Sequence, residues 1–288
     1  MIGASVLAGL GAIAPAPSLA ASLTGATIGG SAPYLIYSQS NNVQAALDGD
    51  SSAPSGNVEL FSNSEQSPIS PPLSEILTGN FSQIFSSFNA FLGSNQYTSL
   101  SGKISGQDIT LSSLMATDWF GESAVNSVKV AIASASAIAN PIAKAAAFSA
   151  AIAPLYDSTN LATKWFSDAL SNYGFTSNQQ LFNIFLLAGG LQRFSDPNIS
   201  YVNQDGGTIK IGLAGHYDAA ALLEIPSIPG LPLQASELVK VVYGGKTEYK
   251  YGFNATPSGL TGSQSGNYEV TVEAVPEPTT ILEYFSSN

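Results

Sequence analysis

The chain contains no cysteine and only one histidine, His216. The absence of cysteine excludes disulfide bonds, thiolate metal sites and cysteine nucleophiles. One imidazole is too few for the usual zinc ligand sets. The string nearest to a serine nucleophile elbow, residues 262–266, has glutamine at its centre. His216, beside Asp218, is therefore either a ligand-binding or basic residue, or a half-buried histidine bonded to nearby backbone. We do not expect an enzyme.

Positively charged residues are scarce. Charged residues make up 10% of the chain, and the nine Lys and Arg residues leave a net charge of −11. They lie singly between Lys103 and Lys250. Because polyanion binding needs clustered Lys and Arg, nucleic acid is not an expected partner. No Gly-rich phosphate loop is present, and we expect no cofactor.

The front of the chain predicts an export signal. Residues 1–16 are uncharged and mostly apolar or small, and Ser18-Leu19-Ala20 forms a small-x-small cleavage site. This pattern predicts a signal peptide over residues 1–20, cleaved between Ala20 and Ala21. The basic start of such a signal is missing, so we expect that the true start lies upstream or was clipped. The run is too short to span a membrane.

The back of the chain carries a sorting motif. An alternating strand over residues 269–275 runs into Pro276, Glu277 and Pro278. This arrangement resembles the tail of PEP-CTERM proteins, a class common in exopolysaccharide-producing bacteria, cyanobacteria included. The resemblance implies that the Pro-Glu-Pro string is read by a membrane exosortase and that the protein reaches the envelope or extracellular matrix. Residues 283–288 hold neither the apolar helix nor the Arg-rich end of that class, so the anchor is either truncated or lost.

Between its two ends the chain predicts one α+β domain over residues 21–275. Apolar residues at helical spacing, an Ala-rich stretch and an apolar run predict a helical, bundle-like part over about 73–194, with a break at Pro141. A mainly antiparallel sheet is expected to follow over about 198–275. Residues 48–72, rich in Ser and Pro, predict an exposed loop. No membrane span is expected in this domain, because its uninterrupted apolar stretches are shorter than about 20 residues.

Hairpins are the clearest β signals. Residues 199–211 are typical of two strands joined by a turn, and residues 239–253 predict a hairpin around Gly244 and Gly245. A short hairpin is also expected around Ser105 and Gly106. The last strand is expected over residues 268–275.

Two groups of residues suggest ligands. Tyr249, Tyr251 and Phe253 share one strand face, which is either a sugar-stacking surface or the core face of a sheet. Asp48, Asp50 and Glu59 have the spacing of EF-hand positions one, three and twelve. Ala53 stands where that loop needs glycine, so the alternative is a plain solvated turn.

The leading hypothesis is an exported envelope or extracellular-matrix protein with a structural or interaction role, associated with exopolysaccharide. One alternative is a carbohydrate-binding module that uses Tyr249, Tyr251 or His216. The other is a polysaccharide hydrolase, which needs two facing carboxylates. The candidates for that pair are the acidic residues in or near the β region: Glu224, Glu237, Glu248, Glu269 and Glu273.

Overall fold

The structure is a computed structural model that describes residues 21–38, 41–61, 81–220 and 229–275. The predicted signal peptide, the Pro-Glu-Pro motif and Glu224 lie outside these residues. The helices are α1 (Val43–Ala46), α4 (Phe81–Gly93), α5 (Ala116–Phe120), α6 (Glu122–Ser136), α7 (Pro141–Ile152), α8 (Leu161–Asn172), α9 (Gln179–Leu187) and α10 (Gly190–Arg193). The strands are β1 (Ala21–Ser22), β2 (Thr24–Gly30), β3 (Tyr34–Tyr37), β4 (Asn57–Leu60), β5 (Thr98–Ile104), β6 (Gln107–Ser112), β7 (Asn198–Asp205), β8 (Thr208–Gly215), β9 (Val239–Tyr243), β10 (Lys246–Lys250), β11 (Thr256–Pro257) and β12 (Gly266–Glu273). The predicted α+β class is confirmed.

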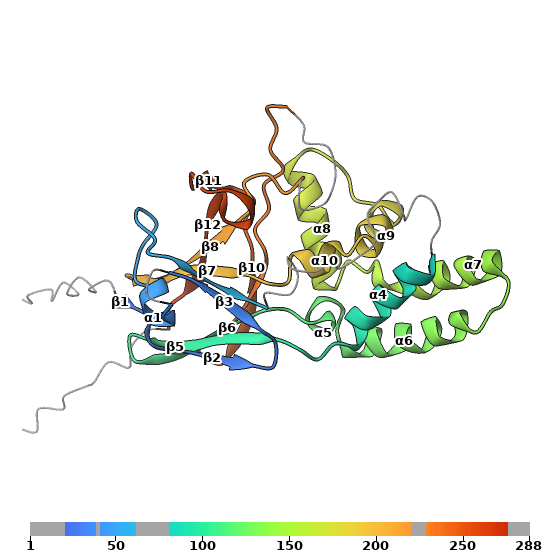
Figure 1. Ribbon diagram of the computed structural model, residues 1–288, viewed down its shortest axis with the longest axis horizontal. Coiled ribbons are helices and arrows are strands. Elements are labelled where there is room, and N and C mark those ends of the chain that lie inside the picture. The colour runs from blue at the N-terminus through green and yellow to red at the C-terminus, as the bar shows by residue number, and fades with distance from the viewer. Residues whose placement is uncertain (1–20, 39–40, 62–80, 221–228, 276–288) are drawn as a thin grey trace, which may run out of the picture.

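The strands form two antiparallel sheets packed face to face (Figure 1). One has seven strands in the order β11-β12-β8-β7-β4-β3, with β1 also paired to β7, and the other has five in the order β10-β9-β6-β5-β2. Alternate side chains of both sheets meet in one buried apolar cluster, because successive residues of a strand point to opposite faces. Its members include Val58, Leu60, Leu100, Ile109, Leu111, Val202, Ile211, Leu213, Val241 and Val270.

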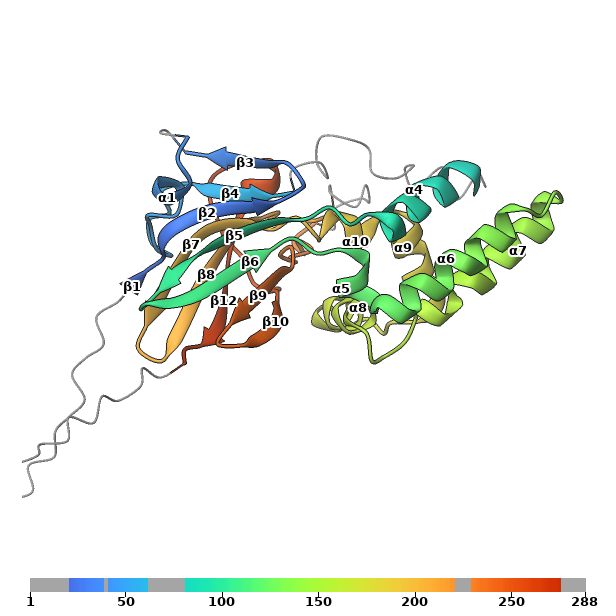
Figure 2. The same ribbon diagram turned by 90° about the horizontal axis from the view of Figure 1, so that it is seen from below.

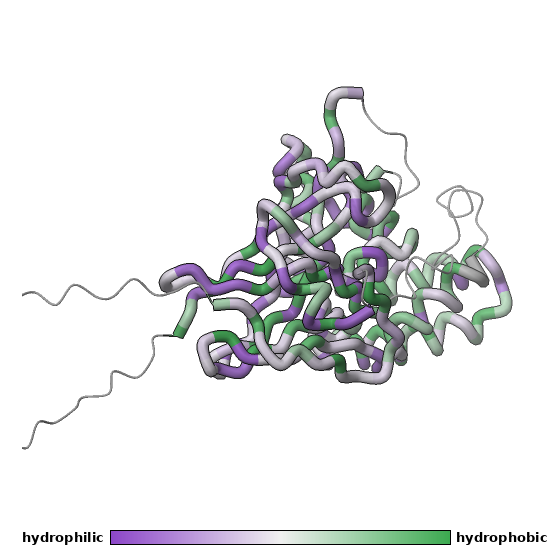
Figure 3. The backbone as a smooth tube through the Cα atoms, turned by 60° about the vertical axis from the view of Figure 1, so that its left-hand side comes forward, coloured by the Kyte–Doolittle hydropathy of each residue, from purple (hydrophilic) through white to green (hydrophobic). Residues whose placement is uncertain are grey.

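The helices from α4 onward surround a second apolar core at one end of this sandwich (Figure 2). Trp119 of α5 and Trp165 of α8 meet edge to face at its centre, with ring centroids 6.0 Å apart. The Trp119 indole donates to Ser195 Oγ at 2.8 Å, so its polar atom is satisfied inside the core. Hydrophobic positions are accordingly spread over both the sandwich and the helices (Figure 3). No helix in the described ranges is long and apolar enough to cross a membrane.

The local predictions that rest on turn chemistry are confirmed. Gly244 and Gly245 adopt φ of 57° and 75° between β9 and β10, as a two-residue hairpin turn requires. Ser105 and Gly106 form the turn between β5 and β6. Pro141 is the first residue of α7, where its missing N–H costs no hydrogen bond.

The predicted order of elements, a central helical part followed by a mainly C-terminal sheet, is not confirmed. Strands β1 to β6 precede most of the helices and supply parts of both sheets. β2 and β5 are rich in Gly, Ser and Thr, so their strand periodicity is weak in the sequence. The apolar run 181–194 is divided between α9 and α10, because Gly189 takes a left-handed φ of 72° between them.

The predicted exposed loop over residues 48–72 is wrong at β4. All four residues of that strand are buried, and β4 lies between β3 and β7. Val58 and Leu60 enter the sandwich core, whereas Asn57 and Glu59 point to the other face of the sheet. The Ser- and Pro-rich flanks hide this four-residue alternation from sequence analysis.

The first and last described strands end side by side. Ala21 pairs with Gln204 on β7, and Glu273 pairs with Thr208 on β8. Both partners flank the β7–β8 turn, whose Gly207 carbonyl also accepts the Ala274 N–H at 2.8 Å. This turn lies at the end of the sandwich opposite α7 (Figure 2).

Candidate functional site

The aromatic stripe that begins on β10 and continues into the residues after it joins the sheet to the helices. Tyr249, Tyr251 and Phe253 are half-buried and pack against the helical core. The Tyr249 hydroxyl donates to Asp118 Oδ1 at 2.9 Å, and the Tyr251 hydroxyl donates to Asp168 Oδ2 at 2.7 Å. These rings do not form the open, flat face that sugar stacking requires.

The three calcium candidates are not brought together. Asp50 is exposed and accepts hydrogen bonds from the Ser52 hydroxyl and from two backbone N–H groups, which hold its pKa below the ordinary value. Asp48 is also exposed. Glu59 is buried on β4 and accepts the Tyr37 hydroxyl at 2.7 Å. In the part of the chain that the structure describes, no three acidic or histidine side chains are placed to hold a metal.

His216, Glu237, Glu248, Glu269 and Glu273 all lie in or next to the strands of the two sheets. His216 is half-buried in the turn after β8, and its carbonyl accepts the Tyr268 hydroxyl at 2.6 Å. Glu237 is buried and accepts the Asn198 N–H, and Glu248 pairs with Lys250 on β10. Glu269 and Glu273 alternate along the outer face of β12.

A groove that the sequence did not reveal crosses the outer face of the seven-stranded sheet. It comprises two cavities, of about 580 Å³ and 330 Å³, that share several lining residues. The larger one takes at least one lining residue from each of six neighbouring strands, among them Tyr37, Asn57, Ser200, Ala214, Asn267 and Thr256. Residues 51–56 form one wall and residues around 256–264 the other. Six strands span roughly 24 Å, so the groove suits an extended ligand.

The register of the sheet explains how distant residues meet in this groove. Glu59 pairs with Asn198, Asn198 with Ala214, and Ala214 with Asn267. Paired residues of neighbouring strands point to the same face. Because Val58 and Leu60 face the core, the polar residues between and beside them must line the outer face.

Asn57 forms part of the groove floor and has an unsatisfied polar atom. The residue is only 5% exposed, and its Oδ1 has no hydrogen-bond partner among the described residues. Both amide atoms of the neighbouring Asn198, which is 1% exposed, also have no partner there. An unmet buried amide costs about 1–3 kcal/mol, so such groups mark places where a polar ligand or water bonds.

Tyr201 and Glu269 shape the second cavity. The Tyr201 ring lies over Gly212, where any Cβ would collide with it. Its hydroxyl donates to Glu269 Oε2 at 2.7 Å. Burial, and then the bond to Glu269, raises the pKa of Tyr201 well above its ordinary value. The ring is therefore held as a neutral phenol at the edge of the groove.

The lining chemistry favours a neutral, hydroxyl-rich ligand. Hydroxyls, side-chain amides and three tyrosines dominate, and none of the described lining residues is Lys, Arg or His. Glu269 is the one carboxylate among them. The buried Glu59 lies three strands away from it, roughly 14 Å, whereas glycosidase carboxylates stand about 5–10 Å apart.

Comparisons with protein families, with curated proteins and with solved structures found no match to this chain. The groove is not apparent in the sequence because its lining comes from strands spread between Tyr37 and Asn267. The available signal was the alternation of Asn57 and Glu59 with Val58 and Leu60, which places two polar residues on one face.

Proposed function

We propose that this chain is an exported protein of the cell envelope or extracellular matrix that binds neutral polysaccharide, without cleaving it, in the groove of the seven-stranded sheet. Sugar hydroxyls are uncharged donors and acceptors, which the Ser, Thr, Asn and Tyr lining complements. The net charge of −11 disfavours acidic polymers. The volume of the larger cavity, about 580 Å³, lies in the usual range for ligand sites.

One observation carries the binding proposal: the buried, unsatisfied Oδ1 of Asn57 on the groove floor. A carbonyl oxygen in this position accepts a hydrogen bond from a ligand hydroxyl. The amide is already desolvated in the free protein, so binding recovers a hydrogen bond without a new desolvation cost at this atom.

The export part of the proposal rests on the two sequence ends. The signal-peptide pattern places cleavage before Ala21, which is the first residue of β1. The Pro-Glu-Pro string directly follows Val275, just after β12. In a full-length form the proposed partner of this string is an exosortase. Attachment through either end would leave the helices at the far side of the molecule (Figure 2).

The binding proposal is tested by retention of the full chain on immobilised dextran, amylose and alginate. We expect retention on at least one of the two neutral glucans and none on anionic alginate. Asn57→Leu removes the acceptor while keeping a side chain of similar size, and should weaken retention about tenfold. Thr271→Leu, an exposed substitution on the outer face of β12 away from the groove lining, is the matched control.

Absence of retention on every glycan would overturn the binding proposal. Equal retention by the Asn57→Leu variant and wild type would overturn the assignment to this groove. Reducing sugar released during incubation would contradict the non-catalytic part. Export is tested separately, by locating the protein in a bacterium that expresses the whole gene, since a cytoplasmic location would overturn that part alone.

A further inference from the structure

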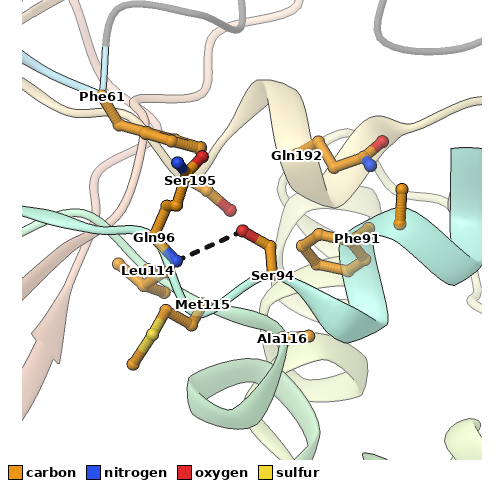
Figure 4. Close-up of a pocket in the computed structure, with 10 residues that line it drawn as sticks. Phe61, Phe91, Ser94, Gln96, Leu114, Met115, Ala116, Gln192 and Ser195 are labelled. Atoms are coloured by element: carbon orange, nitrogen blue, oxygen red, sulfur yellow. Dashed lines mark hydrogen bonds between the residues drawn. The ribbon is translucent and has the colours of Figure 1, made fainter. Parts of the chain in front are cut away.

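A second cavity, different in chemistry, lies where the helices meet the sandwich (Figure 4). It has a volume of about 190 Å³. Five chain segments contribute: the end of β4, helix α4, the turn after it, the approach to α5, and α10 with the residues that follow. Their lining side chains are Phe61, Ala90, Phe91, Ser94, Gln96, Leu114, Met115, Ala116, Gln192 and Ser195.

The cavity has an apolar, buried floor and an open mouth. Leu114, Ala116 and Ser195 on the floor are each at most 2% exposed. Phe91 and Met115 are half-buried on the walls, and Ala90 is exposed at the mouth. A ligand would therefore enter from the side of Ala90 and place its apolar part deepest.

The polar groups of the lining are uncharged. Some already form hydrogen bonds within the protein, and others remain available to a ligand. Ser195 Oγ already donates to the Leu191 carbonyl at 2.6 Å and accepts from Trp119. Ser94 Oγ accepts from the Gln96 N–H at 3.3 Å, which leaves its hydroxyl proton for a ligand. No hydrogen bond of the Gln192 side chain occurs among the described residues, and Gln192 lies across the cavity from Ser94 (Figure 4).

Phe61 forms one wall in a strained backbone conformation. Its φ is 68°, in the left-handed region that a bulky residue rarely adopts. Such a conformation costs about 1–3 kcal/mol and persists where the surroundings fix it, often at ligand sites. It directs the ring of Phe61 toward the cavity (Figure 4).

From these observations we infer that this cavity binds a small, neutral, single-ring aromatic molecule with one hydrogen-bonding group. A dry apolar cavity of about 150 Å³ holds one benzene molecule. A cavity of about 190 Å³ therefore takes one ring with a short substituent. The ring packs between Phe61, Phe91 and Leu114, and the polar substituent bonds to Ser94 and Gln192. A charged ligand is rejected because none of the described lining side chains would neutralise it.

The test uses three probes of similar ring size on the full chain, followed by calorimetry and ligand-observed NMR. These are para-cresol, which has a hydroxyl, toluene, which lacks one, and benzoate, which is anionic. We expect para-cresol to bind, toluene to bind about three- to tenfold more weakly because one hydrogen bond is lost, and benzoate not to bind. Failure of both neutral probes, or equal binding of benzoate, would overturn the inference.

Two variants test whether the probe binds in this cavity. Ala90→Trp closes the mouth and should abolish para-cresol binding, whereas Ala146→Trp, at an exposed alanine of α7, should not change it. Ser94→Ala should remove the preference for para-cresol over toluene while toluene binding persists. Both comparisons use only variants whose melting temperature matches that of the wild-type protein. Undiminished binding by the Ala90→Trp variant would contradict the location.

Discussion

Tyr249 donates its hydroxyl hydrogen bond to Asp118 Oδ1 across 2.9 Å and so joins β10 to α5. The same oxygen accepts Lys240 Nζ at 2.7 Å, and the other oxygen of Asp118 accepts the Met115 N–H. The Asp118 side chain is only 7% exposed, which makes it a largely buried carboxylate with three partners. This contact connects the sandwich to the helical core, and it explains why Tyr249 is not available to a sugar.

Tyr249→Phe should lower the free energy of unfolding by about 1.5–3 kcal/mol, because the variant removes a hydrogen bond to a buried charged group. Tyr251→Phe is the matched comparison. Its partner Asp168 is in an exposed contact, so the loss should be smaller. Urea unfolding of both variants measures the difference. Equal losses in the free energy of unfolding would show that the contact with Asp118 stabilises the fold no more than the contact with Asp168.

Stability should fall as pH rises above about 10, the ordinary pKa of tyrosine. Burial raises the pKa of Tyr249, Tyr251 and Tyr268 in the folded protein, with nearby Asp118 and Asp168 adding to the effect for the first two. The unfolded chain then loses these protons at a lower pH than the folded chain, so deprotonation favours unfolding. The stabilisation is complete below pH 10. Urea unfolding between pH 8 and 11 should show this decrease in the free energy of unfolding. A Tyr249→Phe, Tyr251→Phe double variant should show a smaller decrease.

Gly212→Ala should destabilise the protein by about 1–3 kcal/mol and weaken glycan retention, because the new methyl group displaces the Tyr201 ring. Gly207→Ala is the control, since a Cβ there meets no heavy atom within 4 Å. Thermal melts and retention assays test both variants. If Gly212→Ala retains glycan like wild type, the Tyr201 ring has no part in the groove's function.

A chain that begins at Ala21 should melt at the same temperature as the full chain, as expected if residues 1–20 are a removed signal. A chain that begins at Thr24 should lose at least about 2 kcal/mol, because Leu23 is buried and its N–H donates to Val202. Mass spectrometry of exported protein should find Ala21 at the N-terminus. A mature protein that retains residues 1–20 would contradict the signal-peptide prediction.

Features that depend on neighbours in the chain were predictable. The β9–β10 hairpin follows from alternating apolar residues around Gly244 and Gly245, whose turn only flexible residues adopt easily. The break at Pro141 follows from the missing N–H of proline. The turn at Ser105 and Gly106 was predictable for the same kind of local reason.

Features that depend on pairing between distant segments were not predictable. β4 is four residues long, and it is buried only because β3 and β7 lie on either side of it. The groove follows from that pairing, so neither Asn57 nor Asn198 was singled out. The stripe from Tyr249 to Phe253 was recognised as a surface that packs or binds, but its partner is the helical core, which no local pattern identifies.

The most direct test of the central claim is to follow side-chain amide resonances of the wild-type protein by NMR during titration with a neutral oligosaccharide. The Asn57 and Asn267 amides should shift together and saturate with ligand, while that of Asn126, exposed on α6, should stay unchanged. A bound oligosaccharide that leaves Asn57 unshifted, or that shifts residues of the helical part instead, would contradict a glycan-binding groove on the seven-stranded sheet.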